Sequence, residues 1–393
     1  MKTGQRAFYP RTGRIHGLAI REEKGGAMTG RERLLTALSN GRPDRLPCQV
    51  HGWMDYYLRR YLGGMDSWQA YEHFGMDLAM YVEPAYSYSD RDLARWRVIT
   101  REQSAQENDR RVWEETIETP GGILHKTLAS NEFTTWDTEV LIKSEADFAL
   151  WEKYCPVPTG IDFTEIQKTK DRLRDRGVIR SHPYSPGQGS PWQSFCILAG
   201  TEPAIMMAMD TPEYLHHALG AILERTLKVT EMWKGIPSDM VETGGGAGSN
   251  TVISPSLFEQ FCVPYDRRQH DALHAAGLKI VYHLCGGVMK MLDLVAANGA
   301  DGLETMTPPA MGGDCDLREA SRRVGDRLIF MGGFDQNAGF ERGTPAEARR
   351  LVLECFEATR DHAGYICVPS DHFFFGDPAN IQAFADACRE CRY

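Results

Sequence analysis

The chain has 393 residues, of which 42% are hydrophobic and 25% are charged, values typical of a globular protein. Its formal net charge is −10 and no cluster of basic residues stands out, which argues against a nucleic acid as partner. No apolar run reaches the ~20 residues that a membrane-spanning helix needs, so we expect no membrane partner.

The amino-terminal segment, residues 1–27, holds charged side chains throughout and lacks the apolar core of a secretory signal. A helix start follows it, because Thr29 can cap a helix that begins near Arg31. We therefore expect residues 1–27 to be a poorly ordered extension or a miscalled start. Residues 28–393 should form a single domain of a cytoplasmic protein. Its ten cysteines should then be reduced, most of them as small buried side chains.

Strand patterns recur along the chain and alternate with helix patterns in its second half. Strands are predicted at residues 46–50, 178–181, 240–242, 278–282, 300–304, 328–331 and 365–368. Helices are predicted at residues 256–276, 288–298, 316–324, 344–363 and 378–391. This alternation indicates βαβ units with a parallel sheet. Seven visible strands favour an α/β fold of the (β/α)8 TIM-barrel type over an open sheet.

A different pattern occupies residues 90–140. Segments 97–100, 111–116 and 123–127 alternate in period two, and a Pro-Gly-Gly turn separates the last two. We predict an antiparallel β insertion on the barrel. The glycine-rich residues 244–248 give no GxGxxG pattern that opens a helix, so a dinucleotide-binding fold is not indicated.

Polar side chains gather at the predicted strand ends, where a parallel barrel places its active site. These residues are His51, Glu242, His283, Cys285, Glu304, Asp335, Asp371 and His372. One of them alone would mean little, but eight from six strands indicate a shared functional site. We take Glu242, Glu304 and Asp335 as candidate catalytic acids. The alternative for Glu304 is a salt-bridged carboxylate that lines the barrel.

His283 and Cys285 form the sharpest pair, because residues two apart on a strand point the same way. Imidazole nitrogen and thiolate are both good zinc ligands. The alternative is a buried cysteine beside a hydrogen-bonded histidine. A catalytic zinc needs a third protein ligand and an open position. His372 is well placed for this at a strand mouth, whereas Cys367 lies mid-strand; Glu242, Glu304 and Asp371 are further candidates.

Many aromatic residues are expected around the barrel mouth: Trp53, Tyr56, Tyr57, Tyr86, Tyr88, Trp192, Tyr282, Phe373, Phe374 and Phe375. They could form a cage for a methoxy-aromatic ring or a methylated ammonium group. Packing between helices and loops is the alternative for each of them. We take His51, Trp53, Tyr282 and Phe373 as candidate substrate-binding residues.

In five segments the sequence resembles the uroporphyrinogen decarboxylase superfamily: residues 31–47, 254–261, 283–287, 331–335 and 377–381. The resemblance runs from residue 28 to the C-terminus and implies a (β/α)8 barrel. True decarboxylases carry Arg-Gln-Ala-Gly-Arg after the first strand to hold substrate carboxylates. Residues 50–55 here are Val-His-Gly-Trp-Met-Asp, which argues against a tetrapyrrole substrate. The chain looks closer to the zinc-dependent corrinoid methyltransferases, which carry His-x-Cys at a strand end.

The methyltransferase branch usually takes its third zinc ligand from a cysteine after the last strand, and His372 stands near that place. Either His372 replaces this cysteine, or Cys367 reaches the site by a shifted register. The resemblance implies a Zn²⁺-dependent methyltransferase acting on a small methoxy-aromatic, methylamine or thiol. The corrinoid would belong to a separate partner protein, because this chain lacks an Asp-x-His-x-x-Gly motif. A homodimer is compatible with this. The alternatives are a metal-independent decarboxylase of a non-tetrapyrrole acid and a non-catalytic binder.

Overall fold

The computed structural model describes residues 27–103, 110–185, 189–362 and 364–393. The predicted extension, residues 1–27, therefore lies outside the described residues except for its last one. Helix α1 (Gly30–Leu38) begins where the sequence predicts. The Thr29 side chain accepts a hydrogen bond from the Glu32 amide, and the Glu32 carboxylate accepts one from the Thr29 amide, which makes a reciprocal cap.

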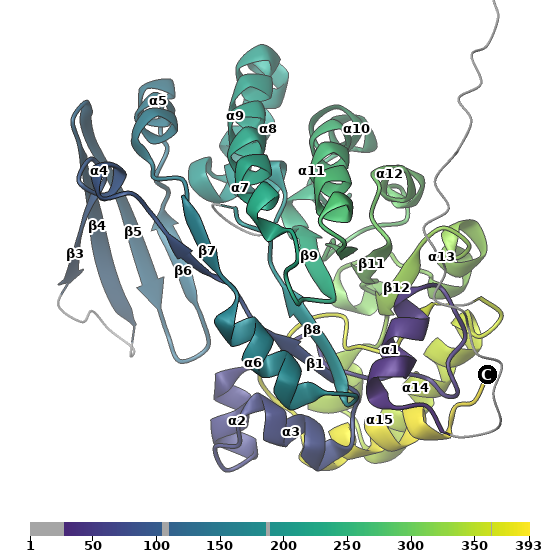
Figure 1. The fold of residues 1–393 in the computed structure, drawn as a ribbon. Coiled ribbons are helices and arrows are strands. Elements are labelled where there is room, and N and C mark those ends of the chain that lie inside the picture. The colour runs from purple at the N-terminus through teal and green to yellow at the C-terminus, as the bar shows by residue number, and fades with distance from the viewer. Residues whose placement is uncertain (1–26, 104–109, 186–188, 363) are drawn as a thin grey trace, which may run out of the picture.

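A curled sheet of parallel strands forms the centre of the molecule (Figure 1). Its strands, in spatial order, are β1 (Leu78–Tyr81), β8 (Gly177–Ser181), β9 (Met240–Gly244), β10 (Lys279–His283), β11 (Gly302–Thr305), β12 (Ile329–Gly332) and β13 (Tyr365–Ile366). All neighbouring pairs run parallel. The predicted α/β barrel architecture is confirmed, although strand β1 was not among the predicted strands.

The predicted strand at residues 46–50 fills the space between β13 and β1. Cys48 pairs with Cys367 in a parallel bridge, and the Cys367 amide donates to the Pro47 carbonyl at 2.9 Å. On the other side, the amide of Asp77 donates to the Cys48 carbonyl at 3.0 Å. This short extended segment therefore occupies the eighth position of the barrel.

Helices cover the outside of the barrel (Figure 1). The predicted helix at residues 256–276 is two helices that meet at Cys262, because Pro264 lacks the amide hydrogen that a continuous helix would need. These two helices are α10 (Pro255–Phe261) and α11 (Val263–Ala275). The other α-helices after α1 are α2 (Asp55–Tyr61), α3 (Ser67–Phe74), α4 (Asp90–Leu93), α5 (Glu145–Tyr154), α6 (Thr164–Leu173), α7 (Pro191–Ala199), α8 (Thr201–Asp210), α9 (Pro212–Thr230), α12 (Leu292–Ala297), α13 (Leu317–Val324), α14 (Pro345–Thr359) and α15 (Pro378–Glu390).

The predicted antiparallel insertion is present and stands to one side of the barrel (Figure 1). It is a four-stranded meander of β3 (Arg97–Gln103), β4 (Arg111–Thr119), β5 (Gly122–Ser130) and β6 (Thr135–Glu139). The last of these strands was not predicted. A separate pair, β2 (Ala85–Ser87) and β7 (Gly160–Asp162), also runs antiparallel.

Alternation along the strands separates the barrel interior from the helix layer. Val178, Met240 and Val281 pack together with Leu34 and Leu38 of α1 in one buried cluster. Since Arg31 of α1 bonds the carbonyl of Gly177, where β8 begins, this helix closes the amino-terminal end of the barrel. The intervening strand residues, such as Ile280 and Tyr282, pack instead with the surrounding helices. Among the described residues, no helix is long and apolar enough to cross a membrane.

The helix layer contains a buried carboxyl group on α11. Asp266 is fully buried, and its Oδ2 accepts a hydrogen bond from the Tyr282 hydroxyl at 2.6 Å. Its Oδ1 has no hydrogen-bond partner among the described residues. Burial raises the pKa of Asp266 to about 7, against the opposing effect of the Tyr282 hydrogen bond. The folded protein therefore holds a proton that the unfolded chain has already released.

This difference in proton binding predicts a pH-dependent effect of Asp266→Asn. Between about pH 4 and pH 7 the folded chain binds more protons than the unfolded chain, so the free energy of unfolding of the wild type falls as pH rises. Asparagine keeps the shape and cannot titrate. As pH rises from about 4 to about 8, the free energy of unfolding of the variant should increase relative to that of the wild type by on the order of 2–4 kcal/mol. Urea unfolding measures this, with the exposed change Asp271→Asn as control; a pH-independent difference would contradict it.

Candidate active site at the carboxyl end of the barrel

A layer of polar side chains lies directly above the apolar interior of the barrel. Each of its strand residues follows an interior residue by two positions and therefore points inward as well. The pairs are Ala79 with Tyr81, Val178 with Arg180, Met240 with Glu242, Val281 with His283, and Gly302 with Glu304. The period-two alternation thus places one ionisable or hydroxyl group from each of five neighbouring strands at the mouth.

Arg180 lies at the centre of this layer and is 1% exposed. Its Nη1 donates to Glu304 Oε2 at 2.8 Å, and its Nη2 donates to Glu304 Oε1 and, at 2.6 Å, to Glu242 Oε2. The guanidinium carbon also lies 4.9 Å from the centre of the Tyr81 ring. The Tyr81 hydroxyl donates to Glu242 Oε2 at 2.9 Å. One cation therefore links two carboxylates from different strands.

Two histidines contact the same carboxylates. His283 Nδ1 lies 3.0 Å from Glu304 Oε1 and 3.3 Å from Glu242 Oε1. His51 Nδ1 lies 3.6 Å from Glu304 Oε1. Potential ligand atoms of these four residues all lie within 4.8 Å of one another, and all four side chains are buried. The structure thus brings together four of the predicted site residues, including Glu242 and Glu304.

Cys285 and His372 flank this group. Cys285 lies two residues after His283, the last residue of β10, and is half-buried. Gly246 allows the close approach of a neighbouring loop, since a Cβ there would lie 2.6 Å from the Cys285 sulfur. The ring of His372 lies 4.5 Å from that of His51, which lies 5.0 Å from that of His283. The three imidazoles therefore follow one another across the mouth.

The charges of the layer balance within it. Burial alone would raise the pKa of Glu304, but Arg180, with His51 and His283, holds it well below the ordinary value. The pKa of Glu242 is also low, since Arg180 and His182 outweigh its burial and the charge of Glu304. Burial lowers the pKa of His182, but its contacts with Glu242 and Glu83 outweigh burial and raise this pKa to about 9. Glu242 and Glu304 are therefore both ionised near neutral pH.

The donor set fits a metal such as zinc. Imidazole, thiolate and carboxylate are its usual protein ligands. Imidazoles and carboxylates meet in the buried group of His51, Glu242, His283 and Glu304, and Cys285 follows His283 by two residues. Glu242 Oε1 is buried without a hydrogen-bond partner among the described residues, which is a costly state unless a cation or proton faces it. His283 faces the same oxygen, with its Nδ1 3.3 Å from Glu242 Oε1 and 3.0 Å from Glu304 Oε1.

The predicted aromatic and acidic residues lie in other surroundings. Trp53 and Phe373 are buried and pack edge to face with each other within a larger aromatic cluster, which fits core packing rather than a ligand cage. Tyr282 faces α11, where its hydroxyl donates to Asp266, so the structure does not bring this predicted substrate-binding residue to the mouth. Asp335 is buried just after β12, where its carboxylate accepts the Ala338 amide hydrogen at 2.9 Å and stabilises a turn.

Sequence reasoning missed Arg180, Tyr81 and His182. Tyr81 lies on the strand that was not predicted, so its alternation with Ala79 could not be used. Arg180 lay on a predicted strand, two residues after Val178. An arginine at an inward position of a buried strand is a signal in itself, because such a charge is almost never buried without partners. Because this signal was not used, the predicted site lacked the buried arginine that β8 contributes.

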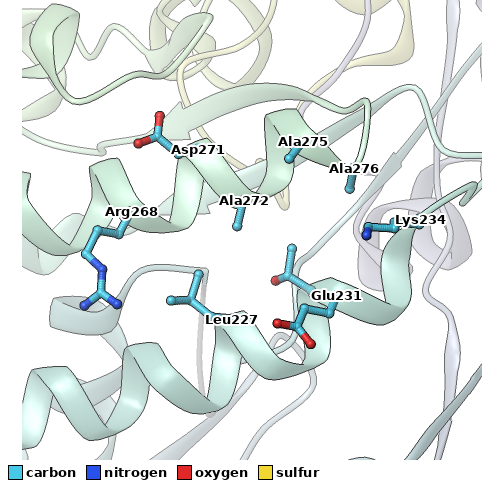
Figure 2. A pocket seen from close by; sticks show the side chains of 9 residues that line it. Leu227, Glu231, Lys234, Arg268, Asp271, Ala272, Ala275 and Ala276 are labelled. Carbon is cyan, nitrogen blue, oxygen red and sulfur yellow. The ribbon is translucent and has the colours of Figure 1, made fainter.

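A groove on the outer helix layer is separate from this site. It lies between α9 and α11 and is lined by Leu227, Glu231 and Ala272, with Lys234 and Arg268 at its ends (Figure 2). None of its lining residues comes from a barrel strand. The groove therefore does not take part in the arrangement at the barrel mouth.

Comparisons with known proteins agree with this architecture. A methyltransferase from Methanosarcina mazei has the same fold, with a TM-score of 0.61 and 15% identity over 92% of this chain and 99% of that protein. The methylcobamide:CoM methyltransferase MtbA from Methanosarcina acetivorans is 26% identical over 125 residues, which cover 29% of this chain and 35% of MtbA.

Similarity to decarboxylases covers more of the sequence. A uroporphyrinogen decarboxylase from Xanthomonas oryzae pv. oryzae is 28% identical over 206 residues, which cover 48% of this chain and 54% of that enzyme. The chain thus spans about half the length of this relative. The uroporphyrinogen decarboxylase family model matches residues 141–391, well over half of the chain. The chain, with its barrel and its polar mouth, therefore belongs to the uroporphyrinogen decarboxylase family.

Proposed function

We propose that this protein is a zinc-dependent methyltransferase that moves a methyl group between a small methylated substrate and the corrinoid of a separate protein. The observation that carries the proposal is the buried group of His51, Glu242, His283 and Glu304 at the barrel mouth, whose ligand atoms lie within 4.8 Å of one another, with Cys285 two residues after His283 and the His372 ring 4.5 Å from that of His51. The likeness to two methyltransferases supports it. Methoxy-aromatics, methylamines and thiols are the proposed substrate classes.

The proposed zinc ligands are His283, Cys285 and His372. Bound there, zinc supplies Lewis acidity to the oxygen, nitrogen or sulfur that loses or gains the methyl group. Glu304 Oε1 is hydrogen-bonded to His283 Nδ1 at 3.0 Å and fixes its ring, and Glu242 Oε1 lies 3.3 Å from the same nitrogen. His51 lies between the other two histidines and is the nearest alternative ligand. The corrinoid partner would dock over the same mouth.

The geometry weighs against decarboxylation of a polyacid. Such a substrate needs cationic side chains that are free to hold its carboxylates. Arg180, the buried arginine of the mouth, is already hydrogen-bonded to Glu242 and Glu304. Residues 50–55 do not supply a replacement, since they contain no arginine or lysine.

The proposal predicts about one zinc per chain in the purified protein, measured by elemental analysis. His283→Ala and Cys285→Ser should each lower the zinc affinity by more than about 100-fold, because loss of a direct ligand costs more than loss of its supporting group. The rate of methyl transfer should fall together with the zinc affinity. This rate is measured by the visible absorption of the corrinoid, with methylcobalamin and a panel of thiols, or with cob(I)alamin and 2-methoxyphenol.

Cys155→Ser is the matched control, because Cys155 is half-buried like Cys285 but remote in sequence and structure from the strand ends. It should keep wild-type zinc content and transfer activity. A wild-type protein without zinc, together with His283 and Cys285 variants that still transfer methyl groups, would sink the proposal.

The third ligand can be identified separately. His372→Ala should lower the zinc affinity strongly, whereas Cys367→Ser should leave it unchanged. The reason is that Cys367 is fully buried with its thiol against Cys388, away from the mouth. Competition with a chromogenic chelator gives both affinities. If His51→Ala causes the large loss and His372→Ala does not, His51 is the third ligand instead.

A further inference from the structure

Arg180 was not among the predicted site residues, yet its hydrogen bonds determine which carboxylate oxygens at the mouth remain free for other partners. Its planar guanidinium binds both oxygens of Glu304 and reaches Glu242 as well. Such a two-pronged contact fixes a carboxylate in orientation as well as in charge. The Tyr81 ring covers the guanidinium at 4.9 Å, and Arg180 is 1% exposed. The cation therefore cannot move aside into solvent.

The remaining contacts of the two carboxylates face His283 and His51. Glu304 Oε1, already bound to Arg180, lies 3.0 Å from His283 Nδ1 and 3.6 Å from His51 Nδ1. Glu242 Oε2 is contacted by Arg180, by Tyr81 and, at 3.3 Å, by His182 Nε2. This leaves Oε1, which lies 3.3 Å from His283 Nδ1. Each histidine thus offers its Nδ1 to the carboxylates, and its Nε2 remains for another partner.

Two positions for a divalent cation follow from the cluster. In one, the ion would lie among the four residues whose ligand atoms lie within 4.8 Å of one another, that is, between the Nδ1 atoms and the carboxylates. Arg180 opposes that position, because its fixed positive charge is bonded to the same oxygens. In the other, the ion would lie away from these oxygens, bound by His283 Nε2 and by the thiol of Cys285, which follows two residues later in the chain.

We propose that Arg180 is a positioning residue that selects the second position. By holding Glu304 as the hydrogen-bond partner of His283 Nδ1, with Glu242 beside it, Arg180 leaves His283 Nε2 to bind an ion together with Cys285 and keeps divalent ions off the carboxylates. This inference rests on the proposed metal site. It also assigns the metal specificity of the site. A nitrogen–sulfur site favours zinc, whereas carboxylates that are not bonded to Arg180 would favour harder ions such as Mn²⁺.

The test uses the full chain, stripped of metal and titrated with Co²⁺, Zn²⁺ and Mn²⁺. Wild-type protein with Co²⁺ should show the near-ultraviolet charge-transfer band of a cobalt–thiolate bond from Cys285. In Arg180→Met, freed carboxylates should weaken this band, lower the zinc affinity about 10- to 100-fold and raise the Mn²⁺ affinity at least about 10-fold. These readouts do not depend on methyl transfer.

Arg180→Lys covers the case in which the methionine variant does not fold. Lysine keeps the charge but loses the planar fork, so zinc affinity should fall about 10-fold while the Mn²⁺ affinity stays low. Arg33→Met is the matched control. Arg33 is also buried between two carboxylates, Asp44 and Asp77, but at the amino-terminal end of the barrel. It should keep wild-type metal affinities.

The outcomes separate the two proposals. A wild-type cobalt spectrum without the thiolate band would overturn the proposed Cys285 site, and the role of Arg180 with it. A wild-type band together with unchanged zinc and Mn²⁺ affinities in the folded Arg180 variants would overturn only the role of Arg180. A greater than 100-fold loss of zinc in Glu304→Gln, with Arg180 variants unaffected, would instead identify Glu304 as a direct ligand.

Discussion

The ion pairs of Arg180 with Glu242 and Glu304 hold the barrel mouth together. A buried ion costs several kcal/mol unless it is paired with good geometry, so these three side chains depend on one another. They come from β8, β9 and β11, and their contacts therefore fix the relative positions of three strands. The Tyr81 hydroxyl and the His283 ring attach to the same carboxylates.

The two ends of the barrel use similar chemistry for different purposes. At the amino-terminal end, Arg33 of α1 pairs with Asp44 and Asp77, and the helix packs its apolar face into the barrel. Solvent and ligands are thereby excluded from that end. At the carboxyl end the polar layer stays accessible through Cys285 and His372, which are half-buried and exposed. The apolar interior of the barrel separates the ion pairs of Arg33 from the polar layer at the mouth.

Much of the site could be predicted because strand alternation is a local property. His283 and Glu304 were found at strand ends from sequence spacing, and both lie there. The surroundings of the aromatic residues could not be predicted. A tryptophan or phenylalanine in a loop gives the same sequence signal whether it packs against a ligand or in the core, and Trp53 and Phe373 pack against each other. Tyr282 points to the helix layer because its neighbour His283 points inward.

The sequence by itself determined the alternation of strands and helices, the antiparallel insertion and the position of His283 at the end of a strand, two residues before Cys285. These follow from periodicity, which involves neighbours in the chain. Only the tertiary structure decided that Arg180, 103 residues before His283, binds Glu304 and so occupies the carboxylates beside that histidine. The reason is that a pairing between distant strands depends on barrel closure and register, which no local pattern records.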